Sequence, residues 1–410
     1  MFVGVGLQTV FTQEKQNGIA SGDHLGVVLA SRQDDERSFT AEVANQSAGN
    51  GFGVDFTFNG YDGSAPTAAL IQDAAGNLYG TTSSGGYGLG VVFKLDTANR
   101  ETLLHVFQGP DGAVPNGALV LDAAGNLYGT TSDGGASGLG SVFKIDSNGI
   151  ETVLHNFTGN PDGAHPYAGL AIDRLGNLYG TAENGGAFGL GIVFEIEPTG
   201  SETVLHNFAG GLTDGADPKA HLILDGVGNL YGTTFSGGSG GYGTVFKLDA
   251  SNTETILYNF TGGSDGGNPV GGVTRDSSGV LYGTTEVTGL PSGPRPYGCC
   301  KGNVYKLNNN IETVLYGFTG GNDGETPACD LILYNGVLYG TTLTGGPGNS
   351  GTIFSVTIAT GSETVLHGFT GGADGATPRG GLLMNSLGFL YGTAETSGKF
   401  QRGTVFRQSK

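Results

Sequence analysis

The stretch "GNLYGTT" occupies residues 76–82 and recurs at 125–131 and 228–234. Variants complete a series of seven: "GNLYGTA" at 176–182, "GVLYGTT" at 279–285 and 336–342, and "GFLYGTA" at 388–394. The leucines of the seven copies are Leu78, Leu127, Leu178, Leu230, Leu281, Leu338 and Leu390. A period near fifty residues, made of short β-type segments, is typical of a β-propeller with one four-stranded sheet per repeat.

One repeat, residues 115–157, shows how the four strands follow one another. We expect strand A at 117–122, strand B at 126–131, strand C at 141–146 and strand D at 151–157. Asp and Gly punctuate the turn between strands A and B, and an Asn-Gly pair separates strands C and D. The last segment, "ETVLHNF", alternates polar and apolar residues as a half-buried strand does.

The repeated motif is best explained by packing between blades. Leu and Tyr would fill the space between neighbours, the Gly would permit close backbone approach, and the Thr pair favours a strand. A blade cannot bury its faces without near-identical neighbours, which explains the repetition. A direct role of the motif in ligand binding is the alternative.

The ends of the repeat region are out of phase in a way that predicts how the ring closes. The segment "FGVDFTF" at 52–58 resembles a lone strand D, and "RGTVFRQ" at 402–408 is a strand C with no strand D after it. Pairing them completes a seventh blade and removes two exposed sheet edges. We therefore expect an all-β, seven-bladed propeller of antiparallel blades over residues 51–410, preceded by a poorly ordered segment and linker at 1–50.

Composition excludes several classes of function. Gly accounts for 80 of 410 residues, charged residues for 13%, and the net charge is −19. Such an acidic chain repels nucleic acid and anionic membranes, and no apolar run is long enough to span a bilayer. We expect a monomer. The first eleven residues lack the basic region and cleavage site of a signal peptide.

The link from strand D to strand A carries Asp-Gly in every repeat, with Pro three residues after the Gly. The aspartates are Asp62, Asp111, Asp162, Asp214, Asp265, Asp323 and Asp374. One interpretation is a ring of calcium-binding carboxylates, but one Asp per blade does not supply the six to eight oxygens that calcium requires. The other interpretation is a turn in which Asp accepts local backbone hydrogen bonds, and we favour it.

Four histidines occupy one slot of strand D in different blades. They are His105, His155, His206 and His367, and Tyr258 and Tyr316 fill the same slot elsewhere. Because the histidines should lie a blade apart, they cannot share one metal ion at bond lengths of about 2 Å. We interpret them as surface or inter-blade packing groups and expect no metal site from them.

The first and third positions after the Pro that opens strand A are small or neutral in most repeats. The exceptions are Tyr167, Lys219, His221, Asp330 and Arg379. All five fall at the channel end of strand A, where polar groups converge in propellers. We predict that they bind a ligand, with Lys219 and Arg379 offering a positive site to a carboxylate or sulfate. The alternative is an ordinary solvated rim.

The longest departure from the repeat is the loop at 286–303, which contains Cys299 and Cys300. Cys329 begins the next strand A, on the same predicted face. A disulfide from Cys329 to either member of the pair is sterically reasonable and would indicate an oxidising compartment. Three Cys without a fourth ligand make a zinc site the weaker alternative.

The chain resembles the bacterial "choice-of-anchor" proteins, which contain tandem GloVer repeats. The resemblance rests on "DxxGNLYGTT", "GxVFK" and "ETVLH" at fixed spacing over residues 52–408. It implies a secreted or cell-surface protein of unassigned activity. A looser similarity to gluconolactonase-like propellers would imply a channel metal held by carboxylates and an amide, for which Asp330 and Asn116 are the candidates.

Motifs of nucleophilic, zinc-protease or phosphate-binding enzymes are absent from the sequence. We therefore favour a non-catalytic extracellular or surface protein that binds a saccharide, peptide or protein on its loop-rich face. The alternatives are a metal-assisted hydrolase or lyase at the channel mouth and a purely structural protein. No cofactor is expected, and calcium is the one ion that the Asp-Gly turns suggest.

Overall fold

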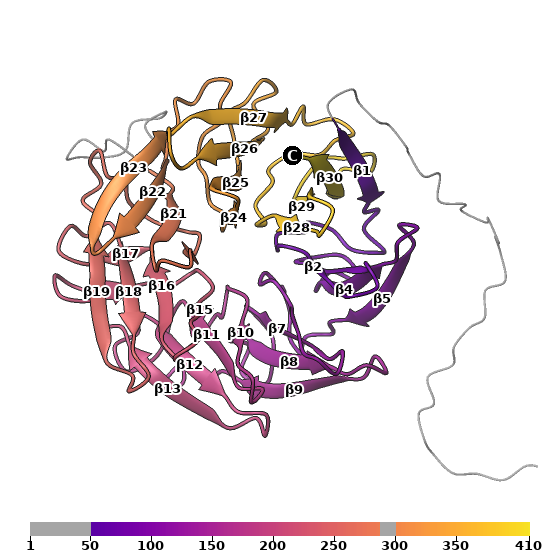
Figure 1. Cartoon of the computed structure of the whole chain (residues 1–410). Coiled ribbons are helices and arrows are strands. Elements are labelled where there is room, and N and C mark those ends of the chain that lie inside the picture. Colours follow the sequence, from indigo (N-terminus) through magenta and orange to yellow (C-terminus); the bar gives the residue numbers. More distant parts are fainter. Residues whose placement is uncertain (1–50, 288–300) are drawn as a thin grey trace, which may run out of the picture. The chain divides into compact units, whose positions relative to one another are not determined.

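The computed structural model describes residues 51–287 and 301–410, which form seven four-stranded antiparallel sheets arranged in a ring (Figure 1). Within these residues there is no helix. The predicted seven-bladed propeller is thereby confirmed. The segment 1–50, for which the sequence predicts poor order, and the loop residues 288–300 lie outside the described residues.

Each blade begins with a short inner strand A and ends with a long outer strand D (Figure 1). Blade 1 contains β2 (Ile71–Gln72), β3 (Leu78–Thr82), β4 (Val91–Leu95) and β5 (Glu101–Val106). Blade 2 contains β6 (Val120–Leu121), β7 (Leu127–Thr131), β8 (Ser141–Ile145) and β9 (Glu151–Asn156). Blade 3 contains β10 (Ala171–Ile172), β11 (Leu178–Ala182), β12 (Ile192–Ile196) and β13 (Glu202–Asn207).

Blades 4 to 6 repeat the same order. Blade 4 contains β15 (Ile223–Leu224), β16 (Leu230–Thr234), β18 (Thr244–Leu248) and β19 (Glu254–Asn259), with a two-residue ribbon of β14 (Gly215–Ala216) and β17 (Ser236–Gly237) beside it. Blade 5 contains β20 (Thr274–Arg275), β21 (Leu281–Thr285), β22 (Asn303–Asn308) and β23 (Ile311–Gly317). Blade 6 contains β24 (Ile332–Tyr334), β25 (Val337–Thr342), β26 (Thr352–Thr357) and β27 (Glu363–Gly368).

Blade 7 joins the two ends of the repeat region. It contains β28 (Leu383–Met384), β29 (Phe389–Ala394), β30 (Thr404–Ser409) and, as its outer strand, β1 (Phe52–Thr57). Strand β1 runs antiparallel to β30, with Phe52 opposite Gln408 and Thr57 opposite Thr404. The predicted closure is confirmed, and it covers the edge that β30 would otherwise expose.

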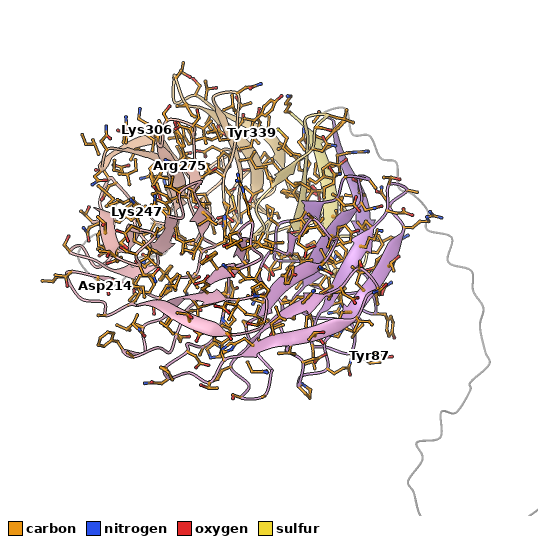
Figure 2. All side chains as sticks on the ribbon, turned by 60° about the horizontal axis from the view of Figure 1, so that its bottom comes forward. Tyr87, Asp214, Lys247, Arg275, Lys306 and Tyr339 are labelled. Carbon is orange, nitrogen blue, oxygen red and sulfur yellow. The ribbon has the colours of Figure 1, made fainter. Side chains whose placement is uncertain are left out.

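The core lies between blades, where side chains fill the space that separates neighbouring ribbons (Figure 2). At every boundary the aromatic residue that follows strand D meets an aromatic residue of the next strand C edge to face. These pairs are Phe58–Phe93, Phe107–Phe143, Phe157–Phe194, Phe208–Phe246, Phe260–Tyr305, Phe318–Phe354 and Phe369–Phe406. Such pairs add about 0.5–1.5 kcal/mol beyond the apolar area that they bury.

Leu and Tyr of the repeated motif pack as the sequence predicts. Leu127 is 3% exposed and belongs to the cluster between blades 1 and 2. The hydroxyl of Tyr128 also donates a hydrogen bond to Asp122 at 3.1 Å, so the tyrosine fastens the turn between strands A and B. Equivalent bonds join Tyr79 to Asp73, Tyr179 to Asp173, Tyr231 to Asp225 and Tyr282 to Asp276.

The glycine of the motif is required by side chains rather than by the backbone approach that we expected. A Cβ on Gly129 would lie 2.6 Å from Cζ of Phe143 and 2.9 Å from Cδ2 of Leu119. The ring of strand C and the leucine of strand A therefore occupy the space above the glycine. Any larger residue would displace them from the core.

The first threonine of the motif has a function that its β propensity does not reveal. Oγ1 of Thr130 donates a hydrogen bond to the carbonyl of Ala168, in the next blade, at 2.8 Å. The equivalent bonds run from Thr81 to Gly117, Thr181 to Ala220, Thr233 to Gly271, Thr284 to Cys329, Thr341 to Gly380 and Thr393 to Ala68. All seven threonines are at most 1% exposed.

The residue before each strand-A proline has a left-handed backbone. These residues are Ala65, Val114, His165, Asp217, Asn268, Thr326 and Thr377, with φ between 53° and 59°. Such angles are unfavourable for β-branched side chains. A hydrogen bond from the Val114 amide to the carbonyl of Leu89, in the preceding blade, holds this conformation, and equivalent bonds occur at the other boundaries. The entry into every strand A is thereby fixed.

Removal of β1 should destabilise the propeller strongly. We compare a chain that begins at residue 51 with one that begins at residue 59. The shorter chain loses the outer strand of blade 7 and the fully buried Phe58, and loss of such a phenylalanine alone costs about 3–5 kcal/mol. Circular dichroism should show a much lower Tm or no cooperative transition. An unchanged Tm would contradict closure by β1.

Candidate functional site

The inner strands of the ring surround a cavity of about 350 Å³. Residues at the start of strand A in every blade line it, among them Thr67, Asn116, Tyr167, Lys219, Val270, Ala328 and Arg379. All five residues predicted to bind a ligand, namely Tyr167, Lys219, His221, Asp330 and Arg379, line this one cavity. Ligand binding by these residues stays a prediction.

His221 of blade 4 and Asp330 of blade 6 form an ion pair in the cavity. Nδ1 of His221 lies 2.9 Å from Oδ2 of Asp330, and Oδ1 of Asp330 accepts a hydrogen bond from the Gly272 amide at 2.6 Å. Burial disfavours both charges, but their mutual attraction outweighs it. It lowers the pKa of Asp330 and raises the pKa of His221 relative to their ordinary values.

The two cations at the mouth already have carboxylate partners. Nζ of Lys219 lies 3.1 Å from Oε1 of Glu183 and 4.4 Å from the ring centroid of Phe235. Nε of Arg379 lies 3.1 Å from Oε2 of Glu395. Glu183 and Glu395 follow strand B in blades 3 and 7. Sequence reasoning missed both, because they lie in loops where variation between repeats carries no distinct signal.

The residues that the gluconolactonase-like resemblance suggested as metal ligands have protein partners in this structure. Oδ1 of Asn116 accepts a hydrogen bond from Thr67 and its Nδ2 donates one to Ser132, both at 3.2 Å. Asp330 is paired with His221. Asn116 and Asp330 belong to blades 2 and 6, and the groups of His, Cys, Asp and Glu that come close enough to hold a metal in residues 51–287 and 301–410 do not include Asp330.

Cys329 is one of the residues that line the cavity. It is a buried free cysteine, and its Sγ accepts a hydrogen bond from the Thr341 amide at 3.1 Å. Burial raises the pKa of its thiol to about 11, which keeps the thiol protonated and unreactive at neutral pH. Cys299 and Cys300 lie outside the described residues, so the predicted disulfide stays a prediction.

The Asp-Gly links form turns, as we expected. Oδ1 of Asp111 accepts a hydrogen bond from the Gln108 amide at 2.8 Å, and Asp374 accepts one from the Thr370 amide at 2.9 Å. The same carboxylates have a second set of partners that the sequence did not indicate, namely the His or Tyr of their own strand D. These pairs are His105–Asp111, His155–Asp162, His206–Asp214, Tyr258–Asp265, Tyr316–Asp323 and His367–Asp374.

A third group completes the arrangement at the blade boundary. In blades 1 to 6 the glutamate that begins strand D faces the aspartate of the preceding link: Glu101, Glu151, Glu202, Glu254, Glu312 and Glu363. Burial, and then the charge of that aspartate, raise the pKa of Glu101 to about 8 and of the others to about 7. The recurrence of "ET" at the start of strand D in blades 1 to 6 was the available signal.

Comparison with known protein families identifies the family of this chain. The Gloeobacter/Verrucomicrobia repeat matches residues 39–234 and 221–410. The chain belongs to this family. The GloVer resemblance drawn from the motif spacing is confirmed. No match to this family member is found among curated protein sequences.

Similarity to solved structures occurs at low sequence identity. The extracellular domain of a B. thetaiotaomicron protein has a TM-score of 0.54 at 10% identity, over 87% of this chain and 42% of that one. A gluconolactonase from Xanthomonas campestris has a TM-score of 0.43 at 14% identity, over 70% and 85% of the two chains. The similarity to the B. thetaiotaomicron domain extends to the fold alone. No helix in the described part of this family member is long and apolar enough to cross a membrane.

The glutamates at the blade boundaries should make the protein more stable at mildly acidic pH. Glu312 and Glu363, whose neighbours are Asp265 with Tyr258 and Asp323 with Tyr316, have folded-state pKa values of about 7 against 4.5 when free. The folded state therefore binds more protons, and stability falls as the pH rises from about 5 to 8. Thermal melts should give a higher Tm at pH 5.5 than at pH 8.

The variant E312Q/E363Q isolates this effect, because glutamine is uncharged at any pH. Its Tm at pH 8 should exceed that of the wild type, and the difference in Tm between pH 5.5 and pH 8 should shrink. If the variant is less stable than the wild type at pH 8, the claim that the two facing carboxylates destabilise the folded protein is contradicted.

Proposed function

We propose that this protein is a non-catalytic binding propeller that takes an uncharged saccharide in its central cavity. The observation that carries the proposal is that the repeat changes at Tyr167, Lys219, His221, Asp330 and Arg379, which all line one cavity. Elsewhere in the ring the same positions hold small residues such as Thr67 and Val270. Packing of the blades does not require the larger polar residues, so a ligand is the better reason for them.

The pairing of charges favours a neutral ligand over an anion. Lys219 with Glu183, His221 with Asp330, and Arg379 with Glu395 each combine a cation with a carboxylate. The mouth therefore has little net charge to attract a carboxylate or sulfate, which the sequence had suggested as the ligand. It keeps many directional donors and acceptors, because an ammonium has three donors and a guanidinium has five.

Sugar hydroxyl groups fit such a surface because each one both donates and accepts hydrogen bonds. The half-buried Tyr167 adds an aromatic face that can cover the apolar side of a sugar ring. A cavity of about 350 Å³ lies within the range of small-molecule sites. We place the protein outside the cell or at the cell surface, which matches the secreted character that the GloVer resemblance implies.

Binding to a glycan array tests the proposal. The labelled full chain should retain uncharged oligosaccharides, and K219A/H221A/R379A should reduce their affinity about tenfold or more, because several hydrogen bonds worth about 1 kcal/mol each are lost. Retention should change little between low and high NaCl, since no net charge is involved.

K144A/K247A is the matched control. Both lysines lie on strand C and neither lines the cavity, so this variant should bind as the wild type does. The proposal fails if no uncharged glycan is retained, if the triple variant binds unchanged, or if binding disappears with salt. Loss of binding at high salt would indicate instead that the site binds an anionic ligand.

A further inference from the structure

Five of the seven blade boundaries, from that of blades 1 and 2 to that of blades 5 and 6, carry a cluster of three polar residues that lies apart from the central cavity. We call it the boundary cluster: the His or Tyr of strand D, the Asp of the following Asp-Gly turn, and the Glu that begins strand D of the next blade. Strand D is the outer strand, so these clusters lie toward the periphery, as Asp214 shows (Figure 2). The residues of each cluster come from two neighbouring blades.

Two boundary clusters bring their polar atoms unusually close together. One is His105, Asp111 and Glu151, and the other is His206, Asp214 and Glu254. In each cluster one atom of the imidazole and one of each carboxylate lie within 4.8 Å of one another. Nε2 of His105 is 2.9 Å from Oδ2 of Asp111, and Nε2 of His206 is 3.4 Å from Oδ2 of Asp214.

Both clusters contain a buried oxygen that lacks a hydrogen-bond partner. Oε1 of Glu151 and Oε1 of Glu254 are buried, and neither has a donor among the described residues; the same holds for Oε1 of Glu312 and Glu363 at the tyrosine boundaries, which lack the imidazole nitrogen. A buried carboxylate oxygen without a partner is costly, and here it faces a second carboxylate. A cation placed between the carboxylates would satisfy both.

The surrounding structure orients the other two groups. Oδ1 of Asp111 accepts the Gln108 amide, which leaves Oδ2 directed at the histidine. The imidazole rings of His105 and His206 pack edge to face on Phe107 and Phe208 at 4.7 and 4.8 Å. Ligands held in this way lose little freedom when they bind an ion.

Two other boundary clusters of the same chain, which contain tyrosine in place of histidine, provide a comparison for these two. At the boundaries of Tyr258 and Tyr316 the backbone, the aspartate and the glutamate are the same in kind. There a phenol hydroxyl donates to Asp265 at 3.1 Å or to Asp323 at 2.9 Å. A neutral phenol is a hydrogen-bond donor, whereas an imidazole nitrogen is a common metal ligand. The fold therefore tolerates either residue, and only histidine adds a ligand.

We propose that the clusters His105–Asp111–Glu151 and His206–Asp214–Glu254 each bind one Zn²⁺ or a similar divalent transition-metal ion. One nitrogen and two carboxylate oxygens from two blades form a set that suits these ions, with water completing the coordination. Two ligand atoms of a tetrahedral Zn²⁺ lie about 3.4 Å apart, and the cluster atoms lie within 4.8 Å of one another, so the widest pairs would close by up to about 1.4 Å. The ions would join blade 1 to blade 2 and blade 3 to blade 4.

Titration of the metal-free full chain with Zn²⁺ in a calorimeter tests this proposal. The wild type should bind two more equivalents than H105Y/H206Y, one for each cluster. The substitution installs the residue that the chain itself uses at 258 and 316, so the fold should be kept. Zn²⁺ should also raise the Tm of the wild type and leave that of H105Y/H206Y nearly unchanged.

Two further variants separate loss of the ligands from loss of the fold. E151Q/E254Q should lose the same two equivalents, whereas E312Q/E363Q, at the tyrosine boundaries, should bind as the wild type does. The proposal is overturned if the wild type takes up no Zn²⁺ at millimolar concentration. It is equally overturned if H105Y/H206Y, or a folded E151Q/E254Q, binds as much as the wild type.

Discussion

At every boundary between blades a buried threonine hydroxyl donates a hydrogen bond, at 2.8 to 3.5 Å, to a carbonyl just before the inner strand of the next blade. This bond ties strand B of one blade to the segment that leads into strand A of the next, which lines the central cavity. It needs two blades to form, so no blade can satisfy it alone. Because Thr393 donates to Ala68, the same bond also closes the ring. The positions of the residues that line the cavity depend on this series.

The sequence predicts the architecture well because each repeat contains its own strands and turns. The spacing of Leu-Tyr-Gly reveals seven blades, and the unmatched segment at 52–58 reveals the closure. What lies between repeats is harder to predict. The partner of Thr130 is Ala168, 38 residues away in the next blade, and the space beside Gly129 is occupied by Phe143 and Leu119. Contacts of this kind leave no local pattern.

The candidate sites, like the fold, are predictable within a repeat and unpredictable where residues of different repeats meet. Departures from the repeat mark Lys219, His221 and Arg379, and the structure places them around one cavity. Their partners Glu183 and Glu395 lie in loops and were not predicted, which changes the expected ligand from an anion to an uncharged molecule. The histidines of strand D are indeed on separate blades, but each pairs with an aspartate that follows its own strand, and His105 and His206 also lie close to a glutamate of the next blade. Membership of the family describes the fold, and the chemistry must come from these particular residues.

The most direct test is the free energy of urea unfolding of Thr393→Val compared with Thr393→Ser. Valine keeps the shape of threonine but removes the donor to Ala68, so it should lower that free energy by about 1–3 kcal/mol. Serine keeps the hydroxyl and should cost about 1 kcal/mol or less, for its lost methyl group. Equal stability of Thr393→Val and the wild type, or an equal loss in both variants, would contradict the dependence of the ring on this bond.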